Sequence, residues 1–186
     1  VLDVNFKSFV GMHKVPVLYG MTIGEYALMI NGEKWLPDSL ICDLTVISFR
    51  KKIDYFLTDT ILPYPPSPNL KTNLAIKLYP TLCFFEGTIL SIGRGTDFPF
   101  QVIGAPDYKN KIFENIENNT YDKIFTKTYS FIPNSRIECK NPKFENKECF
   151  GVRFFTSGQK INLNNIKSDP LDIDLIINFF ENYPKD

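Results

Sequence analysis

The sequence predicts a domain of mixed helices and strands, of the α/β or α+β class, with a mixed sheet and flanking helices. Short β-branched and aromatic runs, typical of strands, occur at 44–49, 81–85, 129–133 and 151–156. Segments with helical spacing or helix-capping signals alternate with these runs along the chain. With 186 residues, of which 44% are hydrophobic, the chain is long enough to bury a core.

The first helix is expected at 22–32, after an extended N-terminal segment. Thr22 and Glu25 form the T-x-x-E pattern of a capping box, and Gly32 stands where a C-terminal cap belongs. The capping box alone explains the position of Glu25. The β-branched run at 44–49 is then expected to form a buried strand.

The middle of the chain is expected to form a helix, a strand and a long loop. Four prolines in "LPYPPSPNLKT" favour a stiff, ordered loop before the helix. The helix over 73–79 should stop at Pro80, and the strand "TLCFF" should follow at 81–85. Residues 86–106 are expected to be loop, and long loops are commonly functional.

The last third of the chain is expected to form two more strands between two helices. A helix is predicted at 108–119 and a well-marked terminal helix at 168–184. Asp169 can cap this last helix and Pro170 suits its first turn, while apolar residues at helical spacing share one face.

Composition and charge exclude several classes of protein. Lys plus Arg and Asp plus Glu each number 21, so no attraction to nucleic acid is expected. The apolar runs are too short for a membrane-spanning helix. The only histidine is His13, and the four cysteines contain no C-x-x-C pair, so neither a metal site nor a cofactor is expected.

The four cysteines fall into two groups. Cys42 and Cys83 lie in apolar runs and are expected to be buried thiols. Cys139 and Cys149 flank a polar loop and are placed to form a disulfide in an oxidising compartment. Since four cysteines allow three pairings, this disulfide is one alternative among three.

The glycine-rich segment at 87–95 does not fit a phosphate-binding loop. Such loops follow G-x-x-x-x-G-K-[ST] or G-x-G-x-x-G and lead into a helix. Here no lysine follows, the third glycine is absent, and Pro99 stands where the helix should run. A nucleotide-binding α/β domain is therefore disfavoured. A serine hydrolase is disfavoured as well, because there is no G-x-S-x-G motif.

The same region carries a candidate site of charged residues. Glu86, Arg94 and Asp97 lie in one irregular segment after an apolar run, a common position for functional groups. We expect Glu86 to be partly desolvated there, which would raise its pKa and suit it to acid catalysis. The alternative is an ion pair between Arg94 and Asp97 that only fixes the loop.

Other candidates are weaker when judged from the residues alone. A lone histidine such as His13 is more often a surface or hydrogen-bonding residue than a catalyst. Tyr19, Tyr64 and Trp35 are able to stack on sugar faces, but the chain has so many aromatic residues that most must belong to the core.

Six ordered segments resemble the latter half of the NamZ-type exo-β-N-acetylmuramidases, a family long known as a domain of unknown function. The resemblance covers nearly the whole chain, and six motifs in order are more specific than any single glycine loop. The segments are "SFVGMHKVPVLYGMTIGEYALMINGEKWL", "CDLTVI", "LPYPPSPNL", "LYPTLCFFEGT", "SIGRGTDFPFQVIGAP" and "KNPKFENKECFGV".

The resemblance implies a bacterial cell-wall glycosidase, periplasmic or secreted, that releases N-acetylmuramic acid from the non-reducing end of peptidoglycan fragments. It implies a larger two-domain protein with a Rossmann-like N-terminal domain. Residues 1–50 would end that domain, and 51–186 would form a C-terminal auxiliary domain with an active-site loop at 83–106. The chain starts at Val1, inside this arrangement, so the upstream segment of the same protein is an expected partner.

The resemblance also implies roles for individual residues. "FFEGT" makes Glu86 a catalytic carboxylate of the site, with a second carboxylate expected in the upstream segment, and six further residues would bind the saccharide: Arg94, Asp97, Glu25, Tyr19, His13 and Asn69. The chain departs from the family pattern at Ile89, where Asn is usual, and at Lys14, where Pro is frequent. The alternative function is that of a truncated, non-catalytic carbohydrate-binding or structural fragment of this fold.

Overall fold

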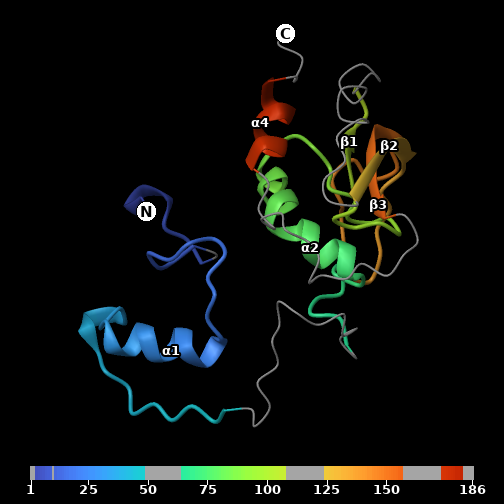
Figure 1. The fold of residues 1–186 in the computed structure, drawn as a ribbon. Helices are drawn as coiled ribbons and strands as arrows, with labels where there is room; N and C mark the ends of the chain where they lie inside the picture. Colours follow the sequence, from blue (N-terminus) through green and yellow to red (C-terminus); the bar gives the residue numbers. More distant parts are fainter. Residues whose placement is uncertain (1–2, 10, 49–63, 108–123, 157–172, 182–186) are drawn as a thin grey trace. The chain divides into compact units, whose positions relative to one another are not determined.

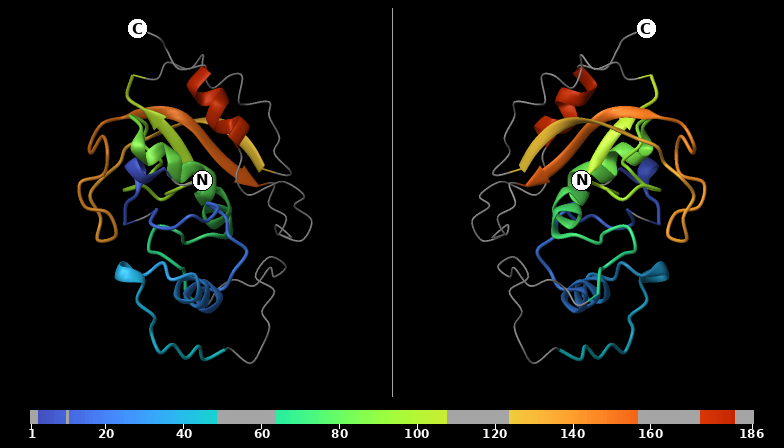
Figure 2. Two further views of the ribbon diagram at one scale, coloured as in Figure 1. Left: turned by 90° about the vertical axis from the view of Figure 1, so that its left-hand side faces the viewer. Right: turned by 90° about the vertical axis from the view of Figure 1, so that its right-hand side faces the viewer.

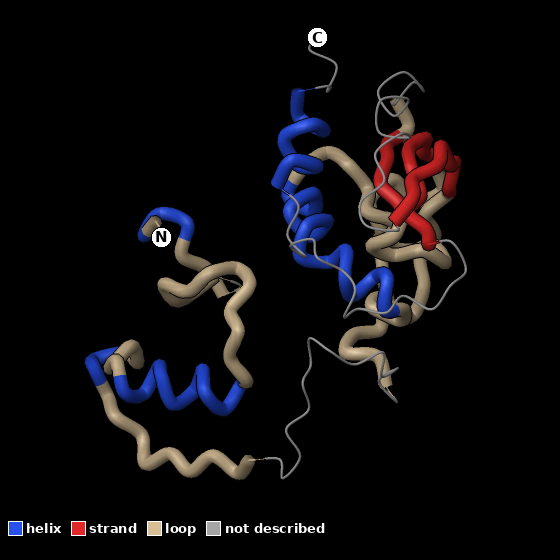
Figure 3. The backbone as a smooth tube through the Cα atoms, in the orientation of Figure 1, coloured by secondary structure: helices blue, strands red, loops and turns tan. Residues whose placement is uncertain are grey.

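The computed structural model describes residues 3–9, 11–48, 64–107, 124–156 and 173–181, in two compact units, Val1–Ile53 and Asp54–Asp186 (Figure 1). In the first unit these residues form helical elements and loops, and in the second they form helices and a sheet (Figure 3). The helix predicted at 108–119 lies outside the described residues, as do the predicted cap residues Asp169 and Pro170.

The first unit is built around helix α1, Ile23–Gly32, with single 3-10 turns at Val4–Phe6 and Pro37–Ser39. The predicted capping box is confirmed: Thr22 Oγ1 accepts from the Glu25 backbone N–H at 3.2 Å, and Glu25 Oε2 accepts from the Thr22 backbone N–H at 2.7 Å. The predicted glycine cap is wrong, because Gly32 is the last helical residue and Lys34 takes the left-handed conformation, at φ 56°.

The strand predicted at 44–49 is wrong over its described residues, 44–48, which are not in a strand. A strand requires a hydrogen-bonded neighbour, and the described residues supply none here. The Asn31 side chain binds the Cys42 backbone instead, its Oδ1 accepting at 2.7 Å and its Nδ2 donating at 2.9 Å. Cys42 is exposed, so its predicted burial is also wrong.

The second unit contains a three-stranded sheet with strands β1 (Val102–Ala105), β2 (Ile124–Phe131) and β3 (Cys149–Thr156). The order is β1-β3-β2, and both pairings are antiparallel. The mixed class of helix and strand is thus confirmed, whereas the described sheet is antiparallel rather than mixed. The strand predicted at 151–156 lies within β3, and the one predicted at 129–133 is confirmed only over 129–131, where β2 ends.

A close approach between two glycines lets β1 pair with β3. Gly104 lies opposite Gly151, and a Cβ on Gly151 would lie 1.9 Å from the Ile103 carbonyl oxygen. Strand β1 falls inside the segment 86–106, which was predicted to be loop. That prediction is wrong for β1, whose residues are all buried, and for Ser91, which forms a bridge with Gly104.

The predicted strand at 81–85 is wrong, because this segment is helical. Helix α2 spans Asn73–Leu82 and continues through Pro80, and a 3-10 helix, η3, follows at Cys83–Gly87. Pro80 removes one backbone donor near the end of α2, a smaller loss than in a helix centre. The turn beyond it buries Leu82 and Phe85, which are 0% and 1% exposed, so packing outweighs the local preference.

The main core lies between α2 and one face of the sheet. Leu74, Leu78 and Leu82 recur along one side of α2 and pack with Val152 and Phe154 of β3. Helix α4, Ile173–Glu181, lies beside α2 and adds Ile176 to this core (Figure 2). The terminal helix predicted at 168–184 is confirmed over these residues. No helix among the described residues is long and apolar enough to cross a membrane.

A smaller apolar cluster covers the other face of the sheet. It contains Val102, Phe131 and Cys149, with Phe98, Tyr129 and Phe144 packed against it. All four cysteines are free thiols, so the Cys139–Cys149 disulfide is not formed. Cys149 is buried in this cluster, and burial raises its pKa to about 12. Cys139 lies apart from the cluster, in a turn.

Candidate functional site

The loop that carries Arg94 is shaped by two glycines in the left-handed conformation. Gly93 and Gly95 have φ values of 79° and 80°. A Cβ at Gly95 would lie 2.6 Å from the Asn134 carbonyl oxygen, and one at Gly93 would lie 2.3 Å from a methyl of Val102. The glycines therefore allow a tight turn that packs on neighbouring backbone, with Arg94 between them.

Hydrogen bonds within the same loop hold this turn. The Thr96 backbone N–H and hydroxyl both donate to the Gly93 carbonyl, at 3.1 and 2.7 Å. The Phe100 N–H donates to the Ile92 carbonyl at 2.8 Å, and the loop then enters β1. A strand follows the glycines instead of a helix, so this loop differs from a phosphate-binding loop, as the sequence predicts.

Glu86 and Arg94 form an ion pair. Arg94 Nε donates to Glu86 Oε1 at 2.5 Å, and the Arg94 guanidinium carbon lies 5.1 Å from the centre of the Phe100 ring. The two side chains are 36% and 38% exposed, so the pair is accessible to solvent. Glu86 is thus less desolvated than predicted, because it lies on the exposed side of η3 and does not end a buried strand.

Asp97 pairs with Arg136 rather than with Arg94. Arg136 Nη1 donates to Asp97 Oδ1 at 2.7 Å. The predicted Arg94–Asp97 pair is therefore replaced by two pairs, Glu86–Arg94 and Asp97–Arg136. Arg136 lies far from the loop in sequence, and nothing in its local sequence marks it as the partner of Asp97.

The charge of Glu86 acts on several titratable neighbours. Burial, followed by the charges of Cys83 and Glu86, raises the pKa of Tyr79, and Arg94 opposes this effect. Burial and then Glu86 also raise the pKa of Cys83. Burial lowers the pKa of Lys143, and Glu86 opposes the change. Glu86 thus has a tyrosine, a thiol and an ammonium group within electrostatic reach.

Lys143 holds the turn that carries Glu86. Its Nζ donates to the carbonyl oxygens of Glu86 at 3.3 Å and Leu90 at 3.1 Å, and also to that of Thr88. One ammonium group thus binds three carbonyls in the segment from η3 to the turn at Gly93–Gly95. Lys143 lies in the segment "KNPKFENKECFGV", but nothing in its local sequence marks it as a partner of this turn.

Asn69 is attached to a turn next to this cluster. The turn is closed by two backbone hydrogen bonds between Arg136 and Cys139, at 2.9 and 3.1 Å. Asn69 Nδ2 donates to the Glu138 carbonyl at 3.2 Å, and Lys71 pairs with the Glu138 carboxylate at 2.8 Å. Asn69 is only 5% exposed, and its Oδ1 has no hydrogen-bond partner within the described segments.

In the first unit, two of the predicted residues join an aromatic cluster. His13 Nδ1 and the Tyr26 hydroxyl are hydrogen-bonded at 2.8 Å, and the His13 ring stacks on Trp35 with centroids 5.6 Å apart. Tyr19 stacks on Tyr26 with centroids 5.0 Å apart. The Glu25 carboxylate binds both the backbone and the hydroxyl of the N-cap residue of α1, so it acts locally in the capping box.

The predicted site residues therefore form two groups. Asn69, Glu86, Arg94 and Asp97 lie in the second unit, while the first unit holds the others: His13, Tyr19 and Glu25. Within the part of the chain that the structure describes, no cluster of three His, Cys, Asp or Glu residues is arranged to bind a metal ion.

Two family models match the chain in sequence. The model for the C-terminal part of exo-β-N-acetylmuramidase NamZ matches residues 77–185, and the model for its N-terminal part matches residues 1–74. The chain is 35% identical over 162 residues to the peptidoglycan β-N-acetylmuramidase NamZ of Bacillus subtilis strain 168. This match covers 84% of the chain and 36% of the relative, so the chain spans little more than a third of that protein.

Two crystal structures of DUF1343 family proteins from Bacteroides fragilis NCTC 9343 are similar to this fold. The first is 41% identical with a TM-score of 0.71, over 97% of this chain and 45% of the other. The second is 28% identical with a TM-score of 0.65, over 90% of this chain and 43% of the other.

Proposed function

The chain belongs to the exo-β-N-acetylmuramidase NamZ family, and on this premise we propose that it is part of a glycoside hydrolase acting on peptidoglycan. The reaction is release of N-acetylmuramic acid from the non-reducing end of cell-wall fragments. The observation that carries the proposal is the accessible Glu86–Arg94 pair, held on a rigid turn inside the segment that the C-terminal family model matches.

Glu86 is the catalytic carboxylate in this proposal. Arg94 binds its Oε1, and among the described residues no hydrogen-bond donor binds Oε2, which leaves this atom for the glycosidic oxygen or a water molecule. Glycosidases ordinarily use two carboxyl groups, whose separation sets the stereochemical outcome. A 2-acetamido sugar is also able to supply its own nucleophile, and Glu86 would then act as the acid/base or stabilising group.

Arg94 supplies recognition of the muramic acid carboxylate. A guanidinium binds a carboxylate through two parallel hydrogen bonds, and the Glu86 contact uses only the Nε of Arg94. Asn69 is a second proposed contact: its buried Oδ1 has no donor among the described residues, and a sugar hydroxyl or amide that reached it would supply one. Asp97 fixes the loop through Arg136.

The first unit would contribute aromatic contacts and the last part of a Rossmann-like domain. Tyr19 and His13, with Tyr26 and Trp35, offer ring surfaces suited to sugar faces. Several of its apolar side chains are exposed, including Ile23 at 83% and Ile47 at 93%. We propose that upstream chain of the same protein covers them, and that the whole protein is periplasmic or secreted.

Hydrolysis of chromogenic saccharides by the full-length protein tests the proposed function. The β-N-acetylmuramide should be cleaved and the β-N-acetylglucosaminide, which lacks the lactyl carboxylate, should be cleaved at least about tenfold more slowly. Absence of cleavage, together with retained binding of muramic acid glycans, would favour the alternative of a non-catalytic carbohydrate-binding fragment. Equal cleavage of both substrates would contradict the role of Arg94.

A further inference from the structure

The face of the sheet that points away from α2 carries two cations side by side. Lys127 of β2 lies directly opposite Arg153 of β3 in the antiparallel register. Directly opposed side chains in a sheet lie on the same face. Val102 of β1 is the other register partner of Arg153, and Val102 belongs to the smaller apolar cluster, so both cations lie on that cluster's face.

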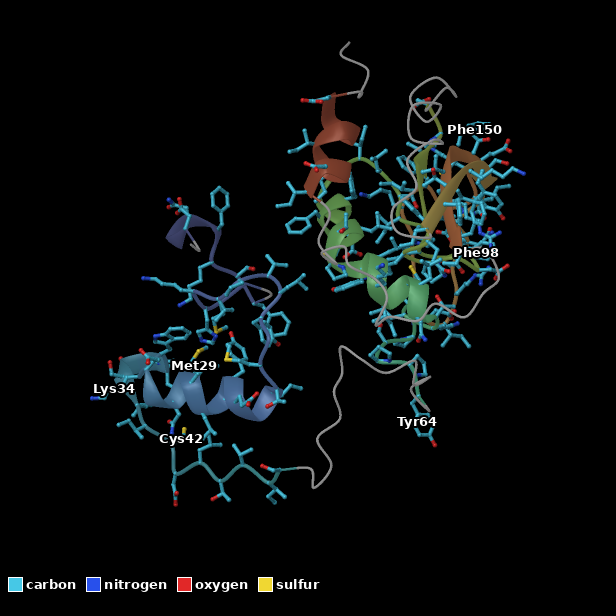
Figure 4. The ribbon with its side chains drawn as sticks, in the orientation of Figure 1. Met29, Lys34, Cys42, Tyr64, Phe98 and Phe150 are labelled. Atoms are coloured by element: carbon cyan, nitrogen blue, oxygen red, sulfur yellow. The ribbon has the colours of Figure 1, made fainter. Side chains whose placement is uncertain are left out.

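Arg153 is held in place by aromatic rings. Its guanidinium carbon lies 3.6 Å from the centre of the Phe98 ring and 5.5 Å from that of Tyr129. The two rings are perpendicular to each other, with centroids 5.9 Å apart. Phe98, labelled in Figure 4, comes from the same loop as Arg94. The guanidinium is thus ordered before any ligand arrives, which lowers the entropy cost of binding.

The two cations have no acidic partner in the part of the chain that the structure describes. No carboxylate among the described residues lies within ion-pair distance of Lys127 or Arg153, and the buried Nε of Arg153 has no hydrogen-bond partner. None of the strand residues on this face is acidic. Like charges directly opposite each other destabilise a sheet, so an anion bound between them would relieve a repulsion.

A pair of stacked phenylalanines adjoins the cations. Phe125 and Phe155 are the next residue pair on this face, with ring centroids 5.8 Å apart and planes at 30°. Both are partly exposed. Aromatic rings beside an ordered guanidinium suit a ligand that carries both a sugar face and a carboxylate.

We propose that this face, formed by Phe98, Phe125, Lys127, Tyr129, Arg153 and Phe155, is an accessory binding site for carboxylate-bearing glycan chains. It is separate from the Glu86–Arg94 pair and retains a polymeric substrate. The carboxylate binds between Lys127 and Arg153, and a sugar ring rests on Phe125 and Phe155. The choice of a carboxylated glycan rests on the proposed function, whose substrate carries a lactyl carboxylate.

Binding of soluble, peptide-free peptidoglycan glycan strands, whose lactyl carboxylates are free, to the full-length protein tests this site. The Glu86→Gln background is used to slow hydrolysis. Lys127→Gln should raise the dissociation constant at least fivefold and reduce the dependence of binding on salt concentration. Lys147→Gln is the matched control, an equal charge change at an exposed residue of the same unit, and should leave binding unchanged. Arg153→Gln should weaken binding further.

Four binding results would contradict the accessory site or its proposed ligand. Equal binding by Lys127→Gln and Lys147→Gln would overturn the site, as would equal binding of strands whose carboxylates have been methyl-esterified. A glycerol phosphate polymer that competes as well as the strands would overturn the choice of a carboxylated glycan. Because binding is measured without turnover, retained and Lys127-dependent strand binding in a protein that proves inactive on muramides would contradict only the proposed function, whereas absence of strand binding would contradict the accessory site.

Discussion

Arg94 Nε and Glu86 Oε1 are 2.5 Å apart, although the two residues lie eight positions apart in the sequence. Both side chains are more than a third exposed, so solvent screens the pair and its contribution to stability is about 1 kcal/mol or less. The energetic cost of removing Arg94 should therefore appear mainly in catalysis.

Replacement of Arg94 tests its role in recognition. Arg94→Met should lower kcat/KM on a chromogenic muramide at least about tenfold, equivalent to ~1.4 kcal/mol, while the free energy of unfolding changes little. Arg136→Met, which breaks the neighbouring pair with Asp97, is the comparison and should lower kcat/KM less than Arg94→Met. A larger loss of kcat/KM in Arg136→Met than in Arg94→Met would show that Arg136, and not Arg94, recognises the substrate.

Lys143 should stabilise the turn that carries Glu86. Lys143→Met removes the ammonium donor from three carbonyls and should lower the free energy of unfolding by about 1–3 kcal/mol in urea denaturation. Lys140→Met is the control, because Lys140 is exposed and has no ion pair among the described residues. Equal stability of the two variants would show that the Lys143 contacts contribute nothing.

Gly95 should not tolerate a side chain. Gly95→Ala places a Cβ 2.6 Å from the Asn134 carbonyl oxygen at a φ of 80°, so it should destabilise the second unit by more than about 2 kcal/mol. Gly87→Ala is the matched control in the same segment, since nothing lies within 4 Å of its added Cβ. Thermal unfolding of the two variants should separate them clearly, and similar midpoints would contradict the loop geometry.

Cys149 should make stability depend on alkaline pH. Its pKa is about 12 in the folded protein against 9.0 for the unperturbed thiol, so the unfolded chain loses this proton first. The contribution is complete below pH 9 and is lost as the pH rises from 9 towards 12. The free energy of unfolding should therefore fall with pH across this window, by at most about 1.4 kcal/mol per pH unit from this group.

Because lysines and tyrosines also titrate there, the comparison with Cys149→Ala isolates the cysteine. The variant should be less stable at neutral pH, and its stability should fall less steeply between pH 9 and 12. Parallel curves for the two proteins would mean that burial of the Cys149 thiol does not determine this part of the pH dependence.

The features that sequence reasoning predicted well are determined by local chemistry. The capping box at Thr22 and Glu25 involves residues three apart, and the strands within β2 and β3 show β-branched and aromatic composition. The grouping of Glu86 and Arg94 also followed from their proximity in the chain. In each case the partners are close in sequence, so spacing carries the information.

Several of the wrong or missed assignments depend on tertiary packing. "TLCFF" has a strand composition but extends α2, because the helical turn directs Leu82 and Phe85 into the core. Asp97 binds Arg136 and not Arg94, a choice made by a contact between distant segments. Lys143 was missed for the same reason, since its three carbonyl partners lie more than 50 residues away.

Turnover by a Glu86→Gln variant of the full-length protein tests the central claim most directly. The substitution keeps the shape of the side chain but removes its charge and its acid/base function. The account predicts a loss of at least about a hundredfold in kcat on a chromogenic muramide, with Glu148→Gln, an exposed carboxylate of the same unit, retaining normal turnover. Turnover by Glu86→Gln within a few-fold of the unmodified protein would contradict the assignment of Glu86 as the catalytic carboxylate.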